Sequence, residues 1–161
     1  MQEIKEYVFL VDKSISMHGK EAEVLEVLNG CVRDCGTCGD EAYATLGLFS
    51  EHLEILYIHN EWQCVRPLNR NVYFVEGNTA LFDAVCEICS RISSNLNRIK
   101  DEIHKHIEIF VITDGIDNAS VYNDAWMCFE ELIRRTGEGW KIHFRTPEGR
   151  KIDLEHVCKN M

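Results

Sequence analysis

Three short segments of this chain carry oxygen-bearing side chains of the kind that bind small cations. They lie at residues 12–16, 77–84 and 112–118. The carboxylates and hydroxyls that could contact a cation there are those of Asp12, Ser14, Ser16, Thr79 and Asp114. All five groups are hard oxygen donors, which suit Mg²⁺. They indicate a metal site if the fold brings the three segments together.

The elements that must position these groups follow from hydrophobic periodicity. Apolar runs predict strands at residues 6–11, 42–49, 53–58, 107–113 and 140–144. Apolar residues at helical spacing predict helices at residues 20–34, 79–105 and 121–135. Strands 42–49 and 53–58 are so close in sequence that they must form an antiparallel hairpin. The alternation of the other strands with helices predicts an α/β fold: a doubly wound, mostly parallel sheet with one antiparallel edge strand and helices on both faces.

This topology predicts where the oxygen donors meet. In open α/β sheets, ligands bind beyond the carboxyl ends of the strands, where the strand order reverses. Asp12 follows the first strand and Asp114 follows the strand at 107–113, so both carboxylates are expected in one crevice. Thr79 opens a helix beside that crevice, and Gly77 lets the backbone pass closely. Mg²⁺ needs six oxygen ligands, so waters or a carboxylate from outside must complete the shell.

The three segments resemble the motifs of the von Willebrand factor A (vWA) domain and its metal-ion-dependent adhesion site (MIDAS). The similarity covers about residues 6–145, and the third segment has the form common in bacterial single-domain members. The resemblance implies direct metal contacts from Ser14, Ser16 and Thr79, and direct or water-mediated contacts from Asp12 and Asp114. It also implies a metal-dependent binding module rather than an enzyme, often a component of a larger assembly. The ion would be Mg²⁺, with Mn²⁺ or Ca²⁺ as alternatives, and the partner protein would supply an Asp or Glu.

Length and composition set the remaining expectations. The chain has 161 residues and reads as a single vWA domain over 1–161, with a core at about 6–145 and a short polar tail at 146–161. Its net charge of −10 disfavours nucleic acid and anionic membranes as partners. Neither a leader segment nor an apolar stretch of membrane-spanning length is evident, so a cytoplasmic location is expected. The eight cysteines are then expected to be reduced thiols.

Two other functions compete with metal-dependent binding. The first is a Mg²⁺-dependent hydrolase such as a phosphatase, in which Lys13 could approach a phosphoryl group; Ser14, however, stands where a general acid would be needed. The second is a zinc or redox protein built on Cys31, Cys35 and Cys38, although packing as structural thiols is favoured.

Three further carboxylate and amide side chains near the second and third segments are expected to have no role as ligands. Asp117 and Asn118 are expected to form a solvated turn. Asp83 is expected to make structural hydrogen bonds in the first turn of its helix.

Overall fold

A single mixed sheet forms the centre of the molecule. The computed structural model describes residues 3–35 and 41–153, and in these ranges the sheet has six strands in the order β3-β2-β1-β4-β5-β6. The strands are β1 (Glu3–Asp12), β2 (Glu41–Phe49), β3 (Leu53–Glu61), β4 (His104–Ile112), β5 (Lys141–Arg145) and β6 (Lys151–Ile152). Strands β2, β1, β4 and β5 are parallel, whereas β3 pairs antiparallel with β2. The predicted hairpin and antiparallel edge strand are therefore confirmed, and β6 adds a short antiparallel strand at the other edge.

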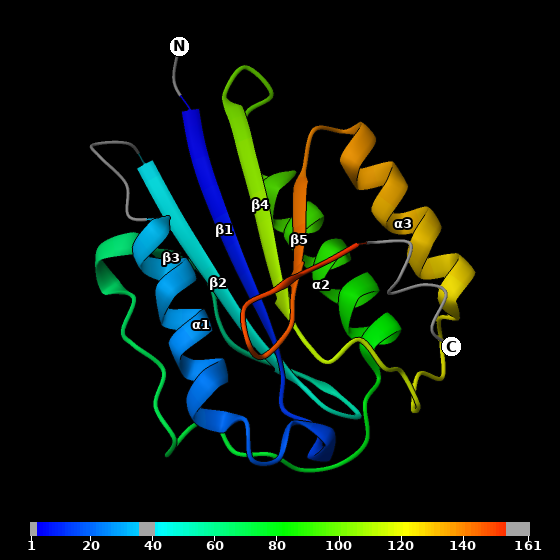
Figure 1. The fold of residues 1–161 in the computed structure, drawn as a ribbon. Coiled ribbons are helices and arrows are strands. Elements are labelled where there is room, and N and C mark those ends of the chain that lie inside the picture. Colours follow the sequence, from blue (N-terminus) through cyan, green and yellow to red (C-terminus); the bar gives the residue numbers. More distant parts are fainter. Residues whose placement is uncertain (1–2, 36–40, 154–161) are drawn as a thin grey trace.

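Helices cover both faces of this sheet, which confirms the predicted fold class. Helix α1 (Glu21–Asp34) lies on one face, and α2 (Leu81–Leu96) and α3 (Ala125–Gly137) lie on the other (Figure 1). Alternate residues of a strand point to opposite faces, so β1 and β4 contribute to two separate cores. The core beneath α2 and α3 includes Val8, Leu10, Ile107, Ile109 and Val111. The core beneath α1 includes Phe9, Val11, Phe110 and Ile112.

Two helix boundaries differ from the sequence prediction. Helix α2 ends at Leu96 instead of continuing to residue 105, and β4 already begins at His104. Helix α3 begins at Ala125 rather than at residue 121, because Asp124 caps it by accepting a hydrogen bond from the Met127 amide at 2.9 Å. In both cases the apolar spacing extends beyond the end of the helix, so the sequence pattern did not reveal the turns after Leu96 and before Ala125.

The segment between β3 and α2 is mostly irregular. It contains one short 3₁₀ helix at Trp62–Cys64. No helix in the described ranges has the length and apolar character needed to span a membrane. The loops at the carboxyl ends of the parallel strands lie together at one end of the molecule, which is the lower end in Figure 1.

Candidate metal centre

The loop after β1 brings its three oxygen-bearing side chains together. The carboxylate of Asp12 is fully buried, and its Oδ1 accepts hydrogen bonds from the Ser14 amide at 2.8 Å and the Ser14 hydroxyl at 2.6 Å. The Ser14 hydroxyl also lies 3.0 Å from that of Ser16. The Ser14 hydroxyl therefore links the Asp12 carboxylate to the Ser16 hydroxyl, and the three side chains form one cluster of the hard oxygen donors that a small cation prefers.

The loop after β4 meets this first loop directly. Val11 pairs with Ile112 in the parallel ladder, which sets Asp12 beside Thr113. The Thr113 hydroxyl donates to Asp12 Oδ2 at 2.8 Å, so both oxygens of the carboxylate accept hydrogen bonds. Burial raises the pKa of Asp12 to about 6, against the effect of these hydrogen bonds, and the nearby negative charge of Asp114 raises it further. Two carboxylates at this edge thus repel each other when no cation is bound.

The segment before α2 is fastened to the same loop through its backbone. The carbonyl of Gly77 accepts from the Ile15 amide at 2.9 Å, between the two serines. Gly77 has φ +74, a left-handed conformation that favours glycine, and an added Cβ would come within 3.4 Å of the Ser50 hydroxyl oxygen. The buried Tyr73 hydroxyl donates to the carbonyl of Asp12 at 2.6 Å. These contacts hold the loop after β1 against the segment that precedes α2.

Thr79 is held against the loop after β4. Its amide donates to Asn118 Oδ1 at 2.7 Å, and its carbonyl accepts from the Asn118 amide at 2.8 Å. The residue is only 2% exposed. Within residues 3–35 and 41–153 its hydroxyl makes no hydrogen bond, and no fully buried side-chain oxygen or nitrogen there lacks a partner. The hydroxyl oxygen must therefore account for part of that small exposed surface, free to contact a ligand.

Asp117 and Asn118 do more than form the solvated turn that the sequence predicted. Asn118 is exposed and Asp117 accepts a local hydrogen bond from the Ala119 amide, but both side chains also bind the segment around the start of α2. Helix α2 follows Ala80, which has no side chain able to cap it. Its first free amides are satisfied from the loop after β4: the Phe82 amide donates to Asp117 Oδ2 at 2.9 Å and the Asp83 amide to the Ser120 hydroxyl at 3.0 Å. The sequence places Asn78 and Thr79 just before this helix, so the need for these long-range partners becomes evident only from the observed helix start.

Asp83 makes the structural hydrogen bonds predicted for it. Its carboxylate accepts from the amides of Val121 at 2.7 Å and of Asn123 at 2.7 Å. Because Asp83 lies in the first turn of α2, the segment after β4 is tied a second time to the helix that Thr79 precedes. Residues Thr113 and Tyr73 also support the centre and were not identified from the sequence.

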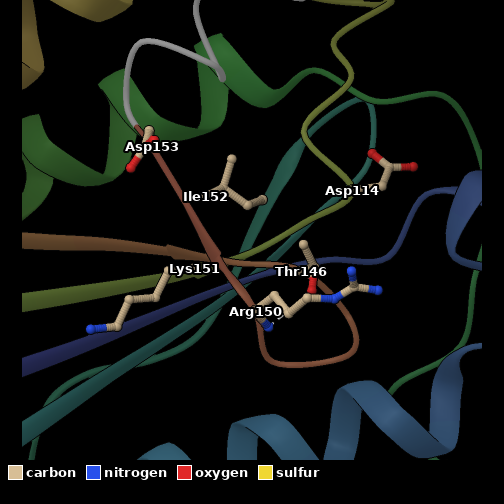
Figure 2. A pocket seen from close by; sticks show the side chains of 6 residues that line it. All are labelled: Asp114, Thr146, Arg150, Lys151, Ile152 and Asp153. Atoms are coloured by element: carbon tan, nitrogen blue, oxygen red, sulfur yellow. Dashed lines mark hydrogen bonds between the residues drawn. The ribbon is translucent and has the colours of Figure 1, made fainter.

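Asp114 is half-buried and borders a pocket of about 360 Å³ (Figure 2). The turn that joins β5 to β6 and the β6 strand form the opposite wall, with Thr146, Arg150, Lys151, Ile152 and Asp153. The Asp114 carboxylate accepts only a 3.2 Å hydrogen bond from the Ile116 amide among the described residues. It therefore keeps oxygen lone pairs available toward the crevice.

The five predicted side chains thus lie on three segments that are hydrogen-bonded to one another. Their chemistry fits a small, hard cation, because two carboxylates supply charge and three hydroxyls supply neutral oxygens. The raised pKa of Asp12 and the unpartnered Thr79 hydroxyl are the features that a bound cation would satisfy.

The rival sites are less well formed. The Lys13 ammonium group lies 3.2 Å from Glu54 and 3.1 Å from Glu76, so it is directed to these carboxylates and not to a phosphoryl group in the crevice. Cys31 packs against the core beneath α1 and Cys35 is buried there, whereas Cys38 lies outside the described residues. In the described ranges, no three His, Cys, Asp or Glu side chains are grouped to hold a metal.

Known structures share this architecture. Manganese-loaded TRAP protein of Plasmodium vivax aligns over 97% of this chain and 61% of its own, with TM-score 0.66 and 18% identity. A von Willebrand factor type A protein of Catenulispora acidiphila aligns over 90% and 33%, with TM-score 0.61 and 18% identity. Proximal thread matrix protein 1 of the mussel byssus, with a zinc-occupied MIDAS motif, aligns over 90% and 36%, with TM-score 0.57 and 15% identity.

This likeness defines the fold. The chain has the fold of a vWA domain, as its three motifs suggested, and it spans about a third to three-fifths of the length of these structures. At the level of sequence, no family model and no curated protein matches it. At 15–18% identity the likeness carries the fold and nothing finer.

Proposed function

We propose that this chain is a metal-dependent protein-binding module that uses Mg²⁺ to hold an acidic residue of a partner. The observation that carries this proposal is the hydrogen-bonded cluster of Asp12, Ser14 and Ser16, to whose loop the Gly77 carbonyl fastens the segment that carries Thr79. The Thr79 hydroxyl has no partner among the described residues. Two of the structures that share its fold are a manganese-loaded protein and a protein with a zinc-occupied MIDAS motif, which supports a divalent ion for this chain.

The hydrogen bonds of each side chain indicate whether it would contact the ion directly or through another group. Ser14, Ser16 and Thr79 would offer neutral hydroxyl oxygens to the ion. Asp12 would act mainly through its neighbours, since both of its oxygens already accept hydrogen bonds from Ser14 and Thr113. Asp114, with fewer hydrogen bonds, would contribute its charge directly or through a water.

A site of this composition favours recognition of an anion. When bound, Mg²⁺ supplies a positive charge with a coordination position that the protein leaves to an outside ligand. With two carboxylates and three neutral hydroxyls, the protein groups neither fill an octahedral shell nor cancel the electrophilic character of the ion. A carboxylate from a partner's Asp or Glu would complete the shell and reduce the electrophilic character of the ion. Lys13 is already paired with two carboxylates, so its ammonium group is not available to clamp a phosphoryl group as a hydrolase would need.

Metal titration by calorimetry tests this proposal. We expect MgCl₂ or MnCl₂ to bind the wild-type protein with one ion per chain, and Thr79→Ala and Asp114→Asn to weaken binding by about tenfold or more. Thr136→Ala, which removes a hydroxyl from the exposed end of α3, and Asp153→Asn, which removes a carboxylate across the pocket from Asp114, should bind as the wild type does. Equal affinity in all five proteins would overturn the proposed ligand set.

A second experiment addresses the partner. Proteins captured on immobilised wild-type protein with Mg²⁺ should be released by EDTA and should not be captured by Thr79→Ala. Capture that survives both changes would show an interface elsewhere on the molecule.

A further inference from the structure

Large apolar side chains are exposed on the loop after β1 and on the segment after β4, the two loops that carry Ser14, Ser16 and Asp114. The five most exposed of them in the described ranges are Tyr122 (82%), Val121 (80%), Trp126 (65%), Ile15 (57%) and Ile116 (54%). All five belong either to the loop after β1 or to the stretch from the end of β4 to the first turn of α3, at the same end of the fold (Figure 1). Apolar groups that gather in this way mark interaction surfaces. We call these five residues the apolar rim.

Two members of the apolar rim stand directly beside the proposed ligands. Ile15 lies between Ser14 and Ser16, and its amide is hydrogen-bonded to the Gly77 carbonyl at 2.9 Å. Ile116 lies two residues after Asp114, and its amide donates to that carboxylate. Both side chains are more than half exposed, so a partner residue that reached the ion would find apolar surface on two of the loops that carry the ligands.

The outer part of the apolar rim is held in place by its backbone. The amides of Val121 and Tyr122 donate to Asp83 at 2.7 Å and 3.1 Å, and Asp124 caps the helix that carries Trp126. The Val121 and Tyr122 side chains therefore project to solvent from a fixed segment. Fixing them in advance lowers the entropy that a partner's binding would cost.

A hollow of about 490 Å³ lies within this outer part. Val121, Tyr122 and Met127 line it, together with Phe82, which is 3% exposed. Asp117 also lines the hollow, but its carboxylate is already engaged by the Phe82 amide. Ser120, Asn123 and Asp124 line it too, and the side chain of each is hydrogen-bonded within the protein. The hollow thus offers both apolar surface and already paired polar groups to an incoming side chain.

We propose that the partner segment carries a single Asp or Glu for the metal, flanked by large aliphatic or aromatic side chains that cover the apolar rim and enter this hollow. The inference rests on the proposed function, since the acidic residue orients the segment. Charge favours a single acidic group, because the chain has a net charge of −10 and would repel a segment with several carboxylates. Among segments that carry one acidic residue, those with apolar side chains beside it would then bind more tightly, because they also cover the apolar rim.

A display library of short peptides with one fixed central Asp tests this inference on the Mg²⁺-loaded protein. Selection should enrich large apolar residues next to the Asp, and only when Mg²⁺ is present. Peptides so selected should lose about tenfold or more in affinity on Val121→Ser/Tyr122→Ser, since two apolar contact surfaces are removed. The matched double variant Ile58→Ser/Ile133→Ser, altered at exposed apolar side chains on β3 and near the far end of α3, should bind these peptides like the wild type.

The outcomes separate this inference from the proposed function. Calorimetry should find Mg²⁺ binding unchanged in Val121→Ser/Tyr122→Ser. If Mg²⁺ binds but selection enriches polar or acidic flanks, or yields no metal-dependent peptides, the apolar-rim inference is wrong while the metal centre stands. Acidic flanks would point instead to Arg150 and Lys151 across the pocket of Figure 2. If no divalent ion binds, the proposed function fails and this inference fails with it.

Discussion

Metal affinity should fall as the pH is lowered, because protonation of Asp12 removes a negative charge that favours a cation beside it. The pKa of this carboxyl is raised by burial to about 6 from its ordinary value of 3.8. With a pKa of about 6, it is mostly ionised near pH 7 and about nine-tenths protonated near pH 5. The apparent dissociation constant for Mg²⁺ should therefore rise about tenfold between these two pH values, which corresponds to about 1.4 kcal/mol.

Calorimetric titration of MgCl₂ at several pH values measures this change. Repeating the titration near pH 6 in buffers of different ionisation enthalpy should reveal the release of about half a proton per ion bound. Asp12→Asn is the control: its metal binding should be weaker, and the part of the pH dependence that Asp12 causes should vanish. An affinity for the wild type that stays flat from pH 7 to pH 5 would refute the link between Asp12 and the metal.

The same pKa shift has a defined sign for the stability of the metal-free protein. The folded-state pKa lies above the unfolded-state value, so between about pH 4 and pH 6 the folded chain binds more protons than the unfolded chain. The contribution of Asp12 to the free energy of unfolding therefore decreases as the pH rises through this window. The shift amounts to about 3 kcal/mol at neutral pH, to order of magnitude. Bound metal should remove this penalty, so added Mg²⁺ should raise the unfolding temperature more at pH 7 than at pH 5.

Three substitutions should test the scaffold around the centre. Gly77→Ala should lower the free energy of unfolding by about 1–2 kcal/mol in urea titrations, because its left-handed backbone is strained for alanine; unchanged stability would contradict this. Tyr73→Phe should cost about 1–2 kcal/mol and weaken metal binding, since the buried carbonyl of Asp12 loses its donor; wild-type values for both would refute this role. Asp83→Ala should increase amide hydrogen exchange at residues 121–123, and unchanged exchange there would show that the carboxylate does not hold that segment.

Patterns over a few neighbouring residues predicted the strands and helices of this protein. They could not predict features that depend on residues far apart in the sequence. The strands β1 and β4 were identifiable because each is a continuous apolar run, and the β2–β3 hairpin because its connection is too short for a crossover. The end of α2 was mistaken because Ile99 and Ile103 continue the helical spacing after the helix has stopped at Leu96.

The supporting hydrogen bonds of the centre lie beyond the reach of local patterns. Asn118 binds the Thr79 amide from 39 residues away, and Thr113 binds Asp12 from 101 residues away. The side chains of these residues look like ordinary turn formers in the sequence. Only the parallel pairing of β1 with β4 gives Thr113 its place. Asp117 and Asn118 take their roles from contacts with the first turn of α2 and with the Thr79 backbone.

These long-range bonds also bear on how the centre would work. The Asp12 carbonyl is held by Tyr73, its carboxylate by Ser14 and Thr113, and the Thr79 backbone by Asn118. Each of these contacts joins two protein groups, so each restricts the loops that carry the oxygen donors. Little reorganisation is then needed on binding, and the free energy of metal binding is not spent on ordering the loops. Differences in affinity between partners should then arise at the surface that surrounds the ion, where Ile15 and Ile116 are exposed.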